Sequence, residues 1–339
     1  MFETARRRLL TALFSTLTLL LGGCEDSDLR IPYIPPTLAN WPQPYRGMPG
    51  LRVHVFTTGT ITMPEAMVLR GGSPFRTREL PVLAFVIAHP TQGLVVFNTG
   101  LTPAAPHEST ARNPLRDFGF GPTVQPGAGL VEQMTAAGLR PDDVHWVVLS
   151  NLRAAHTGEV ERLAQARVVV SKAEHTYARQ TRSDYAARDV DDVSNWKFID
   201  FDAARPLATF RAHVDLFGDG SLLLLDASGT TPGTMALLVR MSDHPLLLAD
   251  DMAAVMENAR YAVQPAAAAD VAQWWEHVWR LKRFQDLVPE LIVVPGHDAQ
   301  PARAARSTEL IVHEPALGPS APPARRTPGV LDRVIPRPM

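Results

Sequence analysis

Apolar and polar positions alternate along the first part of the chain with the period of two that half-buried strands show. The segment 51–58 has this pattern and is followed by Gly59, so we expect a strand that turns at this glycine. The segment 63–78 contains several Gly and Pro residues and predicts an exposed loop. The apolar runs 81–88 and 94–97 predict two paired strands joined by a short turn.

Strand and helix patterns then alternate through the remaining core of the chain. Strands are predicted at 144–149, 167–170, 213–217, 222–225, 235–241, 246–248 and 291–294. Helices are predicted at 130–139, 157–165, 172–180 and 271–287. Two strand-rich halves with interspersed helices indicate the α/β class and, within it, an αββα sandwich that forms a single domain.

The N-terminus has the pattern of an export signal. Arg6, Arg7 and Arg8 precede the apolar run 9–21, which is too short to cross a bilayer as a helix. The run ends in Leu-Gly-Gly-Cys24, which resembles a bacterial lipobox, and we expect residues 1–24 to be a lipoprotein signal peptide and Cys24 to carry lipid. A plain signal peptide with a chance cysteine is the alternative.

Proline-rich segments flank the predicted domain. Residues 25–50 predict an extended tether, 51–306 the folded domain, and 307–339 a disordered tail that cannot bury enough apolar surface to fold. A bacterial cell-envelope location follows from the lipid anchor. The residue after the cysteine is Glu25 rather than the Asp that retains many Gram-negative lipoproteins in the inner membrane, so the outer membrane is expected.

Composition narrows the possible chemistry. Cys24 is the one cysteine of the 339 residues, so a lipidated protein would contain no disulfide, thiolate metal ligand or cysteine nucleophile. Histidines, carboxylates and hydroxyls remain as reactive groups. The formal net charge is -2 and no concentrated basic face is evident, which argues against nucleic acid as a partner. The membrane, through Cys24, is the expected partner.

Polar residues directly follow the strand predicted at 144–149. Strand ends of this kind are where α/β proteins place their chemistry. The stretch resembles the first metal-binding motif of the metallo-β-lactamase superfamily, a strand followed by His-x-His-x-Asp-His. At these ligand positions the chain has Asn151, Arg153, Ala155 and His156.

Further motifs support the resemblance, which covers about 51–300 and is similar to the N-acyl homoserine lactonase branch. Asn98 stands where the superfamily usually has the Asp of Asp-Thr-Gly, behind the metal ligands. Thr234 stands in place of the His of Thr-Pro-Gly-His, Asp251 at the bridging Asp, and His297 at the last ligand. Ala254 replaces a Tyr that assists at the substrate carbonyl in the lactonases.

The resemblance implies different fates for the two metal sites of the superfamily. At the first site Asn151, Arg153 and Thr234 replace ligands, and only Asp251 remains. At the second site Ala155 replaces one ligand, whereas His156, Asp251 and His297 remain. Two imidazoles and a carboxylate can hold one zinc or iron ion, which is the alternative to a protein without a metal cofactor.

Arg153 favours the protein without a metal. A guanidinium in the space of the first metal repels a cation and attracts Asp251, so we expect an ion pair between Arg153 and Asp251. More ordinary roles also exist for the retained residues. His156 and His297 are also consistent with histidines that hydrogen-bond neighbouring loops, and Asp251 with a helix N-cap.

Three functions remain open. The first is a lipid-anchored homologue of lactone hydrolases that has lost dinuclear hydrolysis, is not an enzyme, and binds a small molecule or protein in the old cleft. The second is a mononuclear metal-dependent hydrolase of lactones or esters that uses His156, Asp251 and His297. The third is a non-catalytic surface lipoprotein whose proline-rich tail recruits a partner.

Overall fold

The computed structural model describes residues 35–103, 120–181 and 190–314, and every element below belongs to the unit Pro36–Met339. The predicted signal peptide with Cys24, the first part of the tether and the tail beyond residue 314 lie outside the described residues. Within the described residues, no helix is both long and apolar enough to cross a membrane.

The first sheet is eight-stranded and mixes antiparallel and parallel pairs. Its order is β14-β1-β2-β3-β5-β6-β7, with β4 paired to β1. The strands are β1 (Arg52–Pro64), β2 (Thr77–His89), β3 (Gly93–Phe97), β4 (Gly121–Thr123), β5 (Val144–Val148), β6 (Arg167–Ser171), β7 (Trp196–Ile199) and β14 (Leu310–Val312). From β3 to β7 all pairs are parallel, so the carboxyl ends of these strands share one edge.

The second sheet is six-stranded, in the order β13-β12-β11-β10-β9-β8. Its strands are β8 (Arg205–Leu207), β9 (Phe210–Asp215), β10 (Leu222–Asp226), β11 (Met235–Arg240), β12 (Pro245–Asp250) and β13 (Ile292–Pro295). Only β12 and β13 run parallel, which places the ends of both at the same edge.

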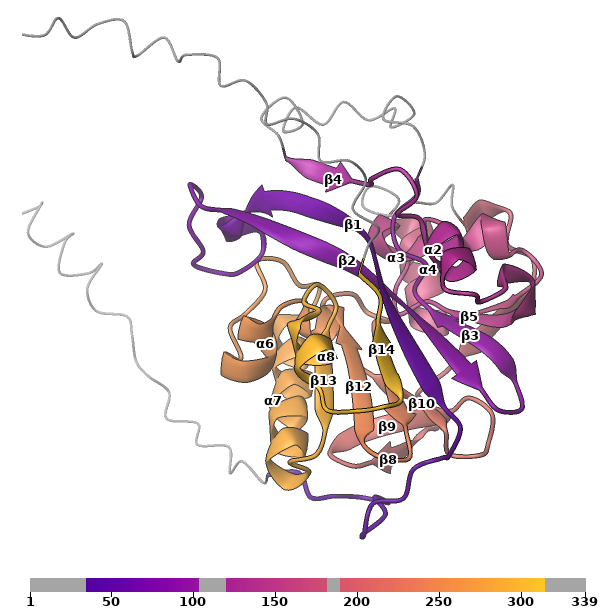
Figure 1. The fold of residues 1–339 in the computed structure, drawn as a ribbon. Helices are drawn as coiled ribbons and strands as arrows, with labels where there is room; N and C mark the ends of the chain where they lie inside the picture. Colours follow the sequence, from indigo (N-terminus) through magenta and orange to yellow (C-terminus); the bar gives the residue numbers. More distant parts are fainter. Residues whose placement is uncertain (1–34, 104–119, 182–189, 315–339) are drawn as a thin grey trace, which may run out of the picture. The chain divides into compact units, whose positions relative to one another are not determined.

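Two helical layers enclose the sheets (Figure 1). The α-helices are α2 (Leu130–Ala136), α3 (Ala154–Thr157), α4 (Lys172–Gln180), α6 (Met256–Tyr261), α7 (Val271–Leu287) and α8 (Gln300–Ala304). The 3-10 helices are η1 (Glu65–Met67), η3 (Pro141–Asp143), η4 (Val160–Leu163) and η5 (Asp251–Ala253). One apolar core lies between the sheets, a second beneath α7 and a third beneath α2 and α4. This is the predicted αββα sandwich.

The strands follow the expected periodicity because alternate side chains enter different cores. Along β2, Leu83 and Phe85 face the second sheet, whereas Ala84 and Val86 face the helices. The long helix is also confirmed: Trp274 is fully buried, and its indole Nε1 donates to the carbonyl of Met252 at 2.9 Å. Trp274 is therefore a core residue.

Several elements were not predicted, among them β7, β8 and α6, and β9 begins and ends earlier than the predicted strand 213–217. Two further differences have a clear physical cause. The first strand continues through a bulge between Thr57 and Gly59 to Pro64, instead of turning at Gly59, because it stays paired with β2 along its length. The helix predicted at 157–165 is instead the short α3 and η4. Buried groups near Thr157 bond to neighbouring loops rather than to a continuous helix, as the 2.9 Å bond from Gly158 N to Gly100 O shows.

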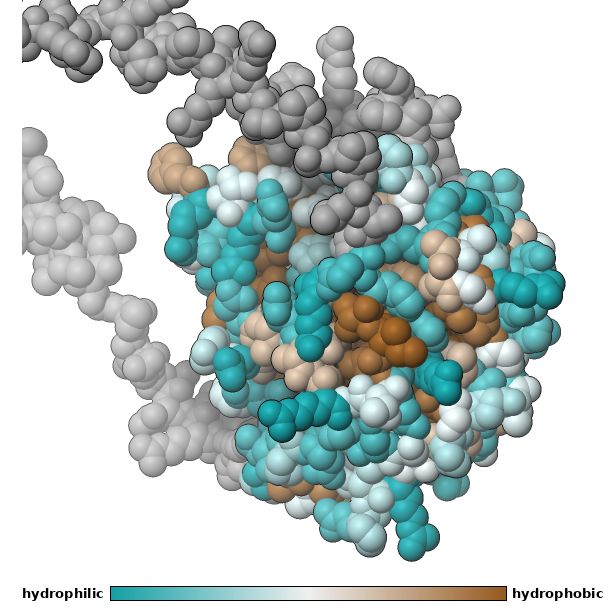
Figure 2. Space-filling view, in the orientation of Figure 1, coloured by the Kyte–Doolittle hydropathy of each residue, from teal (hydrophilic) through white to brown (hydrophobic). Residues whose placement is uncertain are grey.

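The domain boundaries also differ. β14 pairs in parallel with β1 beyond the expected boundary at residue 306, so the folded domain includes the start of the predicted tail. Part of the predicted tether is folded against the domain, since Ala39 bridges Ala208 and the Trp41 ring packs edge-on against Phe284. Figure 2 shows polar residues over most of one face and a hydrophobic patch in the region of β14, whose residues are Leu, Ile and Val.

Candidate functional site

Strand ends from both sheets bring the candidate residues together. Asn98 follows β3, and Asn151 comes shortly after β5 in the first sheet. Asp250 ends β12, Asp251 begins the 3-10 helix after it, and His297 follows β13. The sandwich thus places residues that are distant in the sequence at one edge, as the motif order predicted.

Asn98 and Asp250 form a buried link between the sheets. The Asn98 amide nitrogen donates to Asp250 Oδ1 at 3.0 Å, and its oxygen accepts from the backbone N–H of Ser150 at 2.9 Å. Both residues have positive φ, 58° for Asn98 and 48° for Asp250. Asn tolerates a positive φ better than most residues, whereas Asp250, with ψ -139°, lies outside the left-handed α region in a conformation that is rare for residues other than glycine.

His156 lies between two carboxylates. Its Nδ1 is 3.7 Å from Asp250 Oδ1, and its Nε2 is 3.5 Å from Asp251 Oδ2. All three side chains are almost completely buried, at 4%, 2% and 7% exposure. A buried imidazole between two carboxylates can hold or pass a proton.

Asn151 and Arg153 contact the same oxygen of Asp251 as His156 does. The backbone N–H of Arg153 donates to Asn151 Oδ1 at 3.0 Å, which leaves the amide nitrogen to donate to Asp251 Oδ2 at 3.0 Å. Arg153 Nη1 lies 3.2 Å from the same oxygen, and Nη2 is 3.4 Å from the carbonyl of Thr230. The guanidinium points inward and forms the ion pair that the sequence predicted.

The other substituted positions offer less chemistry. Thr234 is fully buried, and its hydroxyl is hydrogen-bonded to those of Thr230 at 3.0 Å and Thr231 at 2.7 Å. Ala155 and Ala254 carry only methyl groups, although the Ala254 carbonyl accepts from the backbone N–H of His297 at 2.8 Å. This bond holds the loop after β13 against the loop after β12.

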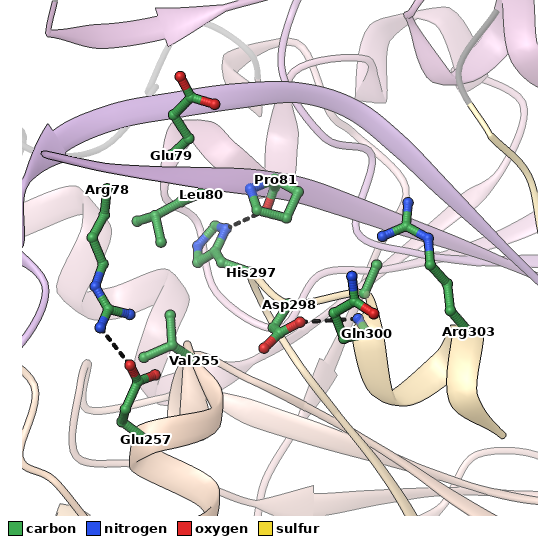
Figure 3. A pocket seen from close by; sticks show the side chains of 11 residues that line it. Arg78, Glu79, Leu80, Pro81, Val255, Glu257, His297, Asp298, Gln300 and Arg303 are labelled. Atoms are coloured by element: carbon green, nitrogen blue, oxygen red, sulfur yellow. Dashed lines mark hydrogen bonds and ion pairs between the residues drawn. The ribbon is translucent and has the colours of Figure 1, made fainter.

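His297 joins the site to a neighbouring groove. Its Nε2 is 3.8 Å from Asp251 Oδ1, and its Nδ1 is hydrogen-bonded to the Pro81 carbonyl at 3.0 Å. Beside it lies a groove of ≈ 320 Å³ with charged walls (Figure 3). Its charged lining residues are Arg78, Glu79, Glu257, Asp298 and Arg303.

The electrostatics of the site centre on Asp251. Burial would raise the pKa of its carboxyl, but His156, Arg153 and His297 outweigh burial and hold that pKa well below its usual range. Burial raises the pKa of Asp250, and the charge of Asp251 adds to the effect. Burial opposes a charge on His156, yet Asp250 and Asp251 together raise its pKa. Asp251 is therefore the permanent anion of the cluster.

The donor groups fit a metal ion on one side of Asp251 only. On the first-site side, Asn151 and Arg153 direct hydrogens rather than lone pairs toward Asp251, and the Thr234 hydroxyl is already bonded within its loop. This side does not fit a cation. On the other side, ligand atoms of His156, Asp250 and Asp251 lie within 4.8 Å of one another, which suits a single ion.

Sequence reasoning missed two residues of the site. Asp250 directly precedes the bridging Asp251 at the end of an apolar strand. This second carboxylate was the sequence feature that could have identified Asp250 as a site residue. Glu174 is fully buried, accepts from Leu152 N at 3.0 Å and Thr231 Oγ1 at 2.5 Å, and so ties the two site loops together. The N-cap role suggested for Asp251 is wrong, because Asp251 is the first residue of η5 and its carboxylate faces Arg153.

Comparisons with known proteins agree with this architecture. A family model described as "Metallo-beta-lactamase superfamily" matches residues 77–297. The chain is similar to the N-acyl homoserine lactonase AttM of Rhizobium radiobacter, with 27% identity over 257 residues that cover 74% of this chain and 94% of that protein. The AttM protein of Azorhizobium caulinodans is 26% identical over 262 residues, with the same coverage.

Solved structures share the fold. A quorum-quenching N-acyl homoserine lactone lactonase superposes with a TM-score of 0.62 at 20% identity, covering 77% of this chain and 98% of that one. A probable metal-dependent hydrolase from Staphylococcus aureus gives a TM-score of 0.59 at 13% identity, covering 73% and 89%. At these identities the likeness concerns the fold alone.

Proposed function

The chain belongs to the metallo-beta-lactamase superfamily, and from this premise we propose that it is a lactonase-like member that binds a ligand and has lost dinuclear metal hydrolysis. One observation carries the proposal: the guanidinium of Arg153 lies 3.2 Å from Asp251, the carboxylate at the bridging position. Arg153 supplies there the positive charge that a metal ion supplies elsewhere in the superfamily.

Coulomb's law gives the size of the effect. A unit charge about 5 Å from a divalent ion, at an effective dielectric of about 20, is repelled by roughly 7 kcal/mol. That energy corresponds to about five decades of affinity. Solvent screens part of this repulsion, because the Arg153 side chain is 35% exposed, although Asp251 beside it is only 7% exposed. Arg153 therefore disfavours a cation at the first site.

The groove beside His297 supports the proposal that the protein binds a small polar ligand. Arg78 is bonded to Glu65 and Glu257, so opposite charges line the same wall. A ligand with both a hydrogen-bond acceptor and a donor matches such a surface better than a purely apolar one. His297 lines this groove and also contacts Asp251, so a bound ligand would affect the buried cluster through His297.

A mononuclear hydrolase is the second candidate function. It is supported by the cluster of His156, Asp250 and Asp251, with His297 on the opposite oxygen of Asp251. One ion held there would supply Lewis-acid activation of water for attack on a lactone or ester carbonyl. In that case Asp250 would be a ligand that the sequence comparison did not anticipate.

We also propose that the protein is anchored to a membrane through a lipid. The Arg-rich start, the short apolar run and the sequence before Cys24 support a lipid on this cysteine and a place in the bacterial cell envelope, with the outer membrane favoured by Glu25. A non-catalytic lipoprotein that recruits a partner through its proline-rich C-terminus is compatible with this anchoring.

Metal analysis of the protein purified without chelator tests the proposal. Near zero zinc and iron per chain supports the ligand-binding protein, because Arg153 then fills the cation position. About one equivalent per chain that the replacement Asp250→Asn removes would establish the mononuclear candidate instead. Two equivalents would reject both, because the dinuclear centre would then be intact.

A further inference from the structure

Helix α7 carries an apolar stripe along the flank of its core face, in which Trp279 is exposed and Trp275 is partly buried against the core beneath the helix. Trp279 is 46% exposed, and its ring stacks against Trp275 at 6.2 Å between centroids with a 19° interplanar angle. Val271, one turn before Trp275, is 36% exposed. Positions 271, 275 and 279 are spaced by four residues, so they form one stripe along the helix. Single exposed apolar residues are common, whereas a contiguous apolar patch marks an interaction surface.

Basic groups border this stripe. Lys282 Nζ lies 5.8 Å from the centroid of the Trp279 ring and donates to the carbonyl of Arg260 at 2.6 Å. That bond brings the end of α6 beside the stripe, where Tyr261 is 68% exposed. Asp286 is the acidic residue in the last turns on this side of α7. Indole and phenol rings beside Lys and Arg are the combination found where proteins meet the headgroup region of a bilayer.

The N-terminal end of the described chain lies at the same helix. The Arg283 side chain, one residue after Lys282, donates to the carbonyl of Pro36 at 3.4 Å. Figure 1 shows the described chain beginning next to one end of α7. Pro36 lies only twelve positions after Cys24 in the sequence, and an extended chain of that length reaches about 40 Å. A lipid on Cys24 would therefore keep the membrane within reach of α7.

From these contacts we infer that the face formed by Val271, Trp275, Trp279, Tyr261 and Lys282 docks on an anionic bilayer surface. The rings enter the headgroup region, and Lys282 with Arg260 meets lipid phosphates. This docking extends the proposed lipid anchoring, but the face would bind the bilayer through its own residues and not through the lipid on Cys24. Docking through α7 would orient the domain on the membrane, which a flexible lipid tether alone does not do.

The chain beginning at Glu25, which keeps every described element and carries no lipid, provides the test. Sedimentation with vesicles of phosphatidylethanolamine and phosphatidylglycerol should show binding that exceeds binding to phosphatidylcholine vesicles. The double replacement Trp275→Ala and Trp279→Ala should reduce partitioning by roughly tenfold, since aromatic burial at the interface contributes on this order. Lys282→Glu should reduce binding only to the anionic vesicles.

A matched control is Phe198→Ala on β7, because Phe198 is 47% exposed and Trp279 46%, and only Trp279 belongs to the docking face. The control should bind vesicles like the parent. Brominated lipids should quench the parent and the control more than the double variant. Equal binding of the parent and the double variant, or no binding by the parent, would overturn the inference. The inference would also be overturned if the parent formed a dimer and the double variant did not, because the face would then be an interface between two copies of the chain. Since no lipid on Cys24 enters the assay, its outcome is separate from that of the anchoring proposal.

Discussion

Arg153 and Asp251 are 98 residues apart in the sequence, yet the guanidinium Nη1 of the first lies 3.2 Å from Oδ2 of the second. The two partners differ in burial, since the Arg153 side chain is 35% exposed and that of Asp251 is 7% exposed. Asp251 also faces His156 and His297. The carboxylate is therefore the centre of the cluster, and Arg153 is one of three side chains whose nitrogen atoms lie within 3.8 Å of it in these ion-pair contacts.

Removing the carboxylate should cost more stability than removing the guanidinium. Asp251→Asn leaves His156 and Arg153 without their common anion, and loss of one partner of a buried pair costs about 3 to 5 kcal/mol. Arg153→Met leaves Asp251 with its histidine and Asn151 contacts, and the exposed side of Arg153 limits the loss to about 1 kcal/mol. Urea unfolding of both variants measures the difference. Equal losses would show that Asp251 is not the centre of the cluster.

Hydrolysis by a dinuclear centre should be absent. Asn151 and Arg153 direct hydrogens at Asp251, and Ala254 offers no hydroxyl to a substrate carbonyl. We expect the purified protein to turn over acyl homoserine lactones and simple esters no faster than buffer, with or without added zinc. Release of homoserine product, followed by chromatography, provides the measurement. Robust turnover that a chelator abolishes would contradict the proposed function and favour a metal-dependent hydrolase.

The sequence predicted the sandwich and the convergence of the site because both depend on strand periodicity and on parallel strands whose carboxyl ends share one edge of a sheet. Arg153, His156, Asp251 and His297 meet as the strand ends required. The link between Asn98 and Asp250 could not be predicted, because it accompanies positive φ angles at both residues rather than a sequence spacing. Such angles are visible only in three dimensions.

The boundary errors have a different physical origin. Proline content marked the segment 25–50 as a tether, but pairing of Ala39 with Ala208 is set by the partner strand and not by local composition. β14 is only three residues long and is followed by a proline-rich stretch, so its pattern was too short to indicate a strand. Tertiary contacts decided both cases.

Acid should weaken the attachment of β14 through His54 and His313, which lie 2.9 Å apart between His54 Nδ1 and His313 Nε2. Burial, with a smaller contribution from the charge of His313, lowers the pKa of His54 to about 4. A lowered histidine pKa means that protonation favours the unfolded chain. The contribution of neutral His54 to the free energy of unfolding is fully present above about pH 6.5 and is lost as pH falls toward about 4.

The replacement His54→Phe should remove this part of the acid sensitivity and keep a ring beside Phe56. The free energy of unfolding of the variant should therefore fall less than that of the parent between these pH values, as urea titrations at several pH values would show. His145→Phe, at an exposed position, is the control and should follow the parent. Parallel curves for parent and His54→Phe would exclude the histidine pair as the cause.

Cys24 should carry lipid when the full chain is produced in a Gram-negative host. The short apolar run after the Arg cluster and the preceding Leu-Gly-Gly support this modification. Mass spectrometry of detergent-extracted protein should find a lipidated N-terminal Cys24, and fractionation should recover the protein with the outer membrane. Cys24→Ser should lose both the lipid and processing at this position. An unmodified Cys24 within a longer soluble chain would refute the anchor.

Restoring ligands at the site should restore metal binding. The double replacement Arg153→His and Ala155→Asp removes the guanidinium that lies 3.2 Å from Asp251 and adds two groups that can ligate zinc. Zinc affinity, measured by calorimetry, should rise by orders of magnitude, because a repulsion of roughly 7 kcal/mol is replaced by new ligands. Arg153→Met alone is the control and should gain less, since it removes the charge without adding a donor. If the double variant binds no more zinc than the parent, the Arg153 charge is not what excludes the ion. The fully buried hydroxyl cluster of Thr234, Thr230 and Thr231 would then be the remaining obstacle, because it has reshaped the loop that should supply another ligand.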